Sequence, residues 1–143
     1  MGTEALSTIV AALFATMLEI SGDSVTPRIA DPPLPEIHRV PRSQVESMTC
    51  GKPCAISAIF VPHLGIFIDS ELDVQNDNYA RSVLLHELVH HAQSLAAKFE
   101  DMGPCEAWRW SEREAYAIQN AYLERIKSAT RVRADALAAM RCR

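Results

Sequence analysis

The sequence has 143 residues, of which 48% are apolar, and a formal net charge of −4. This length and composition predict one globular domain spanning residues 1–143 rather than a disordered chain. No basic patch indicates nucleic-acid binding, and no run of about 18 apolar residues indicates an integral membrane span.

Residues 1–22 predict an N-terminal helix that ends at Ser21–Gly22. A targeting segment is the alternative interpretation, but the first four residues carry no basic side chain and no Ala-x-Ala cleavage site follows. The helical interpretation rests on apolar side chains at helical spacing, namely Leu6, Ile9, Val10, Leu13, Met17 and Ile20.

The next part of the chain predicts a loop and a small sheet. Four prolines exclude regular structure from residues 25–35, a short strand is expected at 36–40, and a helical turn at 43–48. Residues 55–61 and 65–69 are rich in β-branched and aromatic side chains. Because only Pro62-His63-Leu64 separates them, they predict a β-hairpin.

Residues 79–99 contain no glycine or proline and predict a long helix, with Asp77 or Asn78 as its N-cap. One face of this helix is expected to enter the core. Its apolar residues at helical spacing are Leu84, Leu85, Leu88, Ala92, Leu95 and Phe99.

The other face carries His-Glu-Leu-Val-His at residues 86–90, the His-Glu-x-x-His zinc motif. Residues four apart lie about 40° from each other on a helix, so His86 and His90 can converge on one zinc ion. Glu87 would stand beside the metal and could take a proton from a metal-bound water. The motif therefore predicts His86 and His90 as ligands and Glu87 as the catalytic base.

A catalytic zinc needs a third protein ligand, and residues 106–127 predict a second helix that could supply it. Glu112 and Glu114 are the candidates, and they lie about 200° apart on that helix. Glu112 shares its face with the larger apolar stripe, where a carboxylate is costly unless something pairs with it. We therefore favour Glu112, with Glu114 as the alternative.

Residues 128–143 are predicted to form a basic helical tail. Four cysteines suit two disulfides and an extracytoplasmic compartment, periplasmic or secreted. Their pairing cannot be deduced, although a bridge from Cys50 or Cys54 to Cys105 would tie the hairpin to the second helix. Cys50 and Cys54 could instead begin a second zinc site, but no matching pair follows.

The His86-Glu-x-x-His90 motif, followed by a helix with Glu112-x-x-Ala115, resembles the gluzincin branch of the zincin metallopeptidases. A short bacterial family of HExxH proteins is also similar over about residues 50–126. The resemblance implies an α+β zincin-like fold, a small sheet with a hairpin, the HExxH helix and a glutamate-bearing helix. It also implies zinc bound by His86, His90 and Glu112.

Two expectations follow from this resemblance. Residues 65–69, the strand before the HExxH helix, would form the rim of the cleft and bind an extended peptide. Many gluzincins have an aspartate four residues after the glutamate ligand that orients the first histidine. This chain has Tyr116 there, so the partner of His86 stays unassigned.

The function expected from these features is zinc-dependent hydrolysis of peptide bonds in a peptide or protein substrate. Tyr116, His91 and Tyr122 are candidate donors for the oxyanion. The alternative is a zinc-bound module that binds a peptide or regulates a partner without hydrolysis. The presence of Glu87 favours the enzyme, because a purely structural metal site needs no base beside it.

Overall fold

The computed structural model describes residues 2–25, 30–51, 54, 56–133 and 142. Within them the chain is mixed α+β, with four α-helices and one three-stranded sheet, which confirms the α+β part of the predicted fold class. The elements are α1 (Thr3–Ser21), the 3₁₀ turn η1 (Gly22–Ser24), β1 (Ile37–Val40), α2 (Arg42–Thr49), β2 (Ala58–Val61), β3 (Gly65–Asp69), α3 (Asn78–Leu95) and α4 (Pro104–Arg125).

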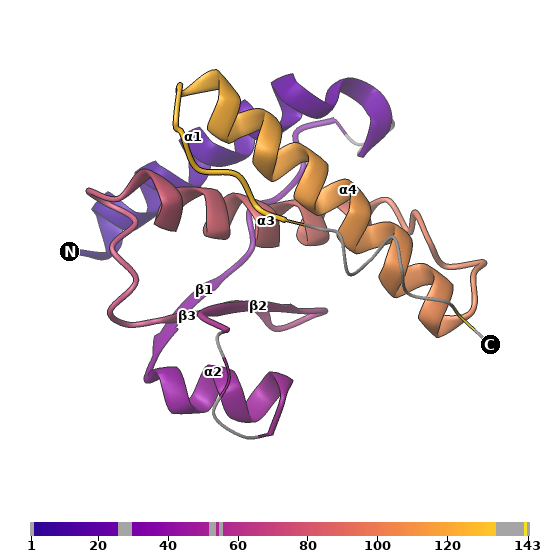
Figure 1. The fold of residues 1–143 in the computed structure, drawn as a ribbon, viewed down its shortest axis with the longest axis horizontal. Helices are drawn as coiled ribbons and strands as arrows, with labels where there is room; N and C mark the ends of the chain where they lie inside the picture. The colour runs from indigo at the N-terminus through magenta and orange to yellow at the C-terminus, as the bar shows by residue number, and fades with distance from the viewer. Residues whose placement is uncertain (1, 26–29, 52–53, 55, 134–141, 143) are drawn as a thin grey trace.

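The sheet has the strand order β1-β3-β2, with β1 parallel and β2 antiparallel to the central strand β3. It lies between α2 and α3, and α1 and α4 pack on α3 beyond it (Figure 1). The hairpin of β2 and β3 is confirmed, but the expectation that residues 65–69 form the cleft rim is wrong. β3 is the central strand, with Ile66 and Ile68 fully buried, and the edge strand that packs on α3 is β2.

The helix α3 begins where the sequence predicts but ends four residues before the predicted end at Phe99. The Asp77 carboxylate caps it by accepting a hydrogen bond from the backbone N–H of Tyr79, at 2.9 Å. The helix stops at Leu95, not at Phe99, because Ala97 takes a left-handed conformation with φ of 49°. Lys98 N–H then bonds to Gln93 C=O, and Ala97 N–H to Ser94 C=O, a Schellman motif formed without glycine.

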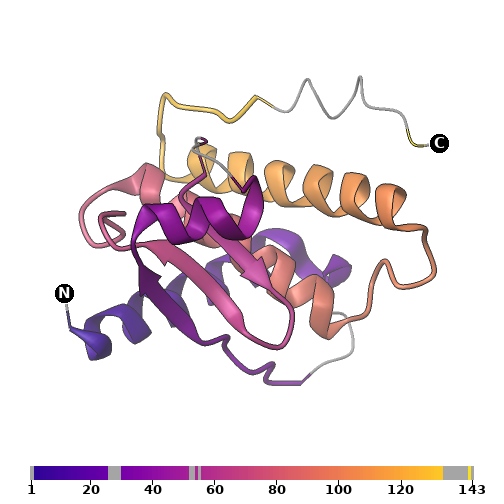
Figure 2. The same ribbon diagram turned by 90° about the horizontal axis from the view of Figure 1, so that it is seen from below.

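The helix α4 ends in the same kind of motif, with Lys127 at φ of 59° and Ser128 N–H bonded to Leu123 C=O. Residues 128–133 are not helical and turn back along α4 (Figure 2). The Asn120 side chain holds them there through both its N–H and its C=O, which bond to the backbone of Val132. The predicted helical tail is therefore wrong for residues 128–133, and residues 134–141 and 143 lie outside the described residues.

The cysteines form two disulfides, Cys50–Cys54 and Cys105–Cys142. The expected number of disulfides is confirmed, but the suggested bridge from the hairpin side to Cys105 is wrong. Because both Cys50 and Cys54 are oxidised, they offer no thiolate pair for a second zinc ion.

The helix α1 ends at Ser21, as predicted, and Gly22 follows with φ of 58°. One face packs into the core, with Leu6, Val10, Leu13, Phe14 and Met17 buried. By length and composition alone, α1 could also cross a membrane, and it is the only such helix among the described residues. The absence of a membrane span therefore stays a prediction.

Gly65 provides a test of the sheet geometry, because it has φ of 111° and its missing Cβ would lie 2.3 Å from the carbonyl oxygen of Glu36. We expect Gly65→Ala to lower the free energy of unfolding by about 1–3 kcal/mol, measured by urea denaturation. Gly103→Ala is the control, since Gly103 has φ of −61° and open space around it. Equal effects of the two substitutions would contradict the strained contact.

Candidate metal centre

His86 and His90 lie one turn apart on α3, and their side chains converge. The two Nε2 atoms are 3.2 Å apart, and the rings meet edge to face with centroids 4.9 Å apart. Two ligands about 2.0–2.1 Å from a tetrahedral zinc ion would lie about 3.3 Å from each other. The histidines are therefore spaced as a chelating pair.

Glu112 reaches the same point from α4, which packs against α3. Its Oε1 lies 2.6 Å from His90 Nε2, and its Oε2 lies 3.3 Å from His86 Nε2. One ligand atom from each of these residues lies within 4.8 Å of the others, a grouping that could hold a metal ion. Two imidazole nitrogens and one carboxylate oxygen are also donors that zinc accepts.

Glu114, the alternative ligand, points elsewhere. Its carboxylate accepts a hydrogen bond from Gln93 Nε2 at 3.0 Å and forms an ion pair with Lys98. The structure thus brings Glu112, and not Glu114, to His86 and His90. That Glu112 acts as a metal ligand stays a prediction.

Gln93 fixes the orientation of His90. The Gln93 Nε2 donates to two acceptors, the Ser111 carbonyl and the Glu114 carboxylate, each at 3.0 Å. The amide oxygen must therefore face His90 Nδ1, 2.9 Å away, and Nδ1 must donate. This leaves His90 Nε2 as the ring nitrogen that faces the cluster.

Gln119 fixes His86 in the same way. Ser82 Oγ donates its proton to the Tyr79 carbonyl, so it accepts from Gln119 Nε2 at 3.1 Å. The Gln119 oxygen then accepts from His86 Nδ1 at 3.0 Å. This carboxamide is the partner of His86 that the sequence left unassigned. Its one signal was its place on the Glu112 face, seven residues along α4.

Without a bound metal, His90 and Glu112 form a half-buried ion pair. Burial lowers the pKa of His90, but the hydrogen bond to Glu112 and nearby carboxylates outweigh burial and raise it to about 9. Burial raises the pKa of Glu112, but hydrogen bonds from His86 and His90 outweigh burial and lower it to about 2. His90 Nε2 therefore holds a proton toward Glu112, at the position where a cation would replace it.

Glu87 stands beside this cluster with one oxygen fixed. Its Oε1 accepts a hydrogen bond from the backbone N–H of Phe60 in β2 at 3.1 Å. Its Oε2 lies 3.9 Å from His86 Nε2, too far for a hydrogen bond. Burial raises the pKa of the Glu87 carboxyl, despite the opposing effect of the two histidines. The residue is therefore placed to accept a proton and not to join the chelating group.

Of the three candidate oxyanion donors, only Tyr116 lies at the cluster, with its ring centroid 4.5 Å from that of His86. Burial and the nearby carboxylates raise the pKa of Tyr116 to about 12, so its phenol keeps its proton. His91 instead contacts the Pro33 carbonyl at 2.7 Å, between Phe14 and Phe60. Tyr122 lines a separate cavity.

Two hollows of about 690 and 500 Å³ meet at the cluster. Ile59, Glu87, Trp108 and Glu112 line both, so the hollows form one cleft along β2 with the cluster at its centre. The larger is lined by apolar side chains that include Met48, Ile56, Val83 and Val132.

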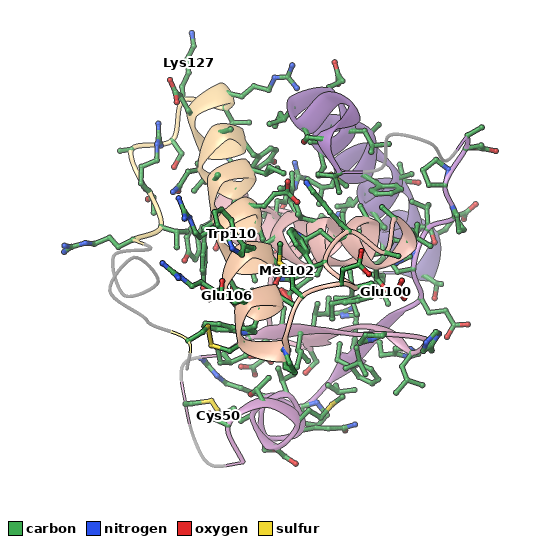
Figure 3. All side chains as sticks on the ribbon, turned by 90° about the vertical axis from the view of Figure 1, so that its right-hand side faces the viewer. Cys50, Glu100, Met102, Glu106, Trp110 and Lys127 are labelled. Atoms are coloured by element: carbon green, nitrogen blue, oxygen red, sulfur yellow. A yellow bond between two sulfur atoms is a disulfide. The ribbon has the colours of Figure 1, made fainter. Side chains whose placement is uncertain are left out.

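Met102 and Trp110 are exposed on the face where α4 begins (Figure 3).

The two pKa shifts predict how the stability of the metal-free protein changes with pH. The lowered pKa of Glu112 gives stability that is present above about pH 4.5 and lost toward pH 2, and the raised pKa of His90 gives stability that is lost between about pH 6.5 and 9. We expect urea unfolding in a chelator to show both losses. In Glu112→Gln both losses of stability should be smaller. A pH profile identical to that of the parent protein would contradict the pairing of Glu112 with His90.

Glu112→Gln should also weaken zinc binding at least 10-fold, because a neutral amide replaces a charged ligand. Competition against a chromophoric chelator would measure the zinc affinity. Glu124→Gln is the matched control, since Glu124 is exposed on the same helix and should leave the affinity unchanged. An unchanged affinity in Glu112→Gln would exclude Glu112 as a ligand.

Neither a scan against protein-family models nor searches of curated proteins and solved structures gave a match to this chain. A metal centre is therefore inferred from the chain's own contacts. They are two histidines with converging nitrogens, a carboxylate within reach of both, and two carboxamides that orient the rings.

Proposed function

We propose that this protein is a zinc-dependent hydrolase that cleaves peptide bonds in a peptide or protein substrate. The observation that carries the proposal is the position of Glu87, a buried carboxylate held beside the histidines by the N–H of Phe60. A metal site that only stabilised the fold would gain nothing from a second buried carboxylate, which is costly to desolvate.

His86, His90 and Glu112 would hold the metal ion, leaving a fourth position open to the cleft. Zinc bound there would act as a Lewis acid that polarises a carbonyl group and lowers the pKa of water to about 7. The donor set of two imidazoles and one carboxylate fits zinc, and its closest matches among metal enzymes are catalytic sites.

Glu87 would serve as general base and then as general acid. Its Oε2 would take a proton from the attacking water and deliver it to the amine that leaves. The hydrogen bond from Phe60 holds Oε1, so the carboxylate cannot rotate away from this task. The phenol of Tyr116 would donate to the oxygen of the tetrahedral intermediate.

The free edge of β2 supports an extended peptide as the substrate. Ser57 C=O accepts from Asp69 N–H across the hairpin, so Ile59, two residues on, also pairs with β3. Successive residues of an antiparallel strand direct their backbone N–H and C=O groups to opposite sides. The backbone groups of Ala58 and Phe60 therefore point toward the open edge. Phe60 N–H is used by Glu87, and the remaining groups can pair with a substrate strand in the cleft.

The arrangement of elements supports a zincin-like architecture of the gluzincin type, which we propose on the same footing. An edge strand lies along the metal helix, and the next helix brings a glutamate to the two histidines. The difference from the family pattern lies behind the first histidine, where Gln119 takes the place of an aspartate.

Glu87→Gln tests the proposal, because it keeps the size of the side chain and removes the base. We expect the substitution to leave zinc content unchanged and to lower hydrolysis of a peptide library by roughly 10²- to 10⁴-fold. Cleavage would be followed by mass spectrometry on the zinc-loaded protein, before and after a chelator removes the metal.

Glu71→Gln is the control for this experiment, since Glu71 is exposed in the segment that leads to α3. Unchanged cleavage in Glu87→Gln would show that the activity has another source. If the zinc-loaded parent protein cleaves no peptide but binds peptides in the cleft, the function is that of a binding module.

A further inference from the structure

We propose that Glu114 is a positioning residue of the metal centre, which acts through Gln93 to keep His90 Nε2 available for the metal. The inference rests on the zinc site proposed above and assigns a role to a carboxylate that does not touch it. One residue, Gln93, connects Glu114 to the cluster, because Gln93 contacts both Glu114 and His90.

The side-chain amide of Gln93 has two possible orientations. With its oxygen toward His90, the ring donates from Nδ1, and Nε2 can offer a lone pair to a cation. With its nitrogen toward His90, Nδ1 would have to accept, and the proton of the neutral ring would move to Nε2. The second orientation removes a ligand, so the amide orientation decides whether His90 can bind metal.

The neighbours of the Gln93 amide select one of these orientations. Gln93 is buried, and its Nε2 bonds to the Ser111 carbonyl and to Glu114. A flipped amide would turn its oxygen toward both of these acceptors. A hydrogen bond to a carboxylate is about twice as strong as a neutral one, so Glu114 contributes most of the preference for the binding orientation.

Lys98 holds the Glu114 carboxylate in place. Lys98 forms an ion pair with its other carboxylate oxygen and also donates to the Ser24 carbonyl at 2.5 Å. The Schellman motif at the end of α3 turns the chain so that Lys98 can reach both groups. The side chains of Lys98 and Glu114 are 28% and 20% exposed, so the pair is shielded from competing water only in part.

The two histidines therefore differ in how their orientation is secured. His86 depends on a neutral chain through Gln119 and Ser82 to a backbone carbonyl within α3. His90 depends on a chain that ends in an ion pair between the end of α3 and α4. The charged chain makes the metal affinity of His90 depend on residues of both helices.

A double-mutant cycle on the full chain tests the proposal, with zinc affinity as the readout. Gln93→Met should weaken zinc binding by roughly 10- to 100-fold, the usual effect of removing a partner of a metal ligand. Glu114→Met should weaken it by about 10-fold, and Glu114→Gln, which keeps an acceptor oxygen, should recover most of that loss. In the Gln93→Met background, Glu114→Met should have almost no further effect.

Cobalt substitution gives a second readout, because the visible spectrum of bound cobalt reports the ligand set. We expect weakened Glu114→Met protein to regain the parent spectrum at high cobalt concentration, since the ligands themselves are unchanged. Urea unfolding of the metal-free variants measures any general loss of stability. A loss of zinc affinity that tracks this stability equally in both Gln93 backgrounds would overturn the proposal.

The outcomes separate this inference from the proposed function. A parent protein that binds zinc, combined with unchanged affinity in Glu114→Met, would reject the role of Glu114 and leave the zinc site intact. A parent protein that binds no zinc would reject the zinc site itself, and with it the role of Glu114.

Discussion

The contact between His86, His90 and Glu112, which are buried or half-buried, is the constraint on which the rest of this structure depends. Each of these groups would be costly to bury alone, and together they pay part of that cost by neutralising one another. The contact requires α3 and α4 to pack in one register. The surrounding carboxamides, serine and lysine then satisfy the polar atoms that this packing leaves inside.

The sequence was a good guide where chemistry and local spacing act together. The convergence of His86 and His90 follows from helical geometry, and the preference for Glu112 follows from the cost of an unpaired carboxylate in an apolar stripe. The Asp77 cap and the hairpin were also predictable, because caps and turns depend on neighbouring residues.

The features that the sequence did not reveal depend on tertiary contacts. Gln93 and Gln119 are ordinary helix residues until α3 and α4 meet, and only then does each amide acquire a histidine to orient. The end of α3 was missed because Ala97 adopts a left-handed conformation without the usual glycine. The assignment of β3 to the rim failed because strand order is not encoded in the spacing of strands along the chain.

The Cys105–Cys142 disulfide helps to hold α4, the helix that carries Glu112. It closes a loop with a sequence separation of 37 that contains all of α4 except Pro104, including Glu112 and Gln119. In the chain-entropy model, a loop of this size restricts the unfolded chain by about 3–4 kcal/mol. With the proposed zinc ion bound to Glu112, a thiol reductant and a chelator would therefore loosen the same helix, so loss of either crosslink would lower the protein's resistance to loss of the other.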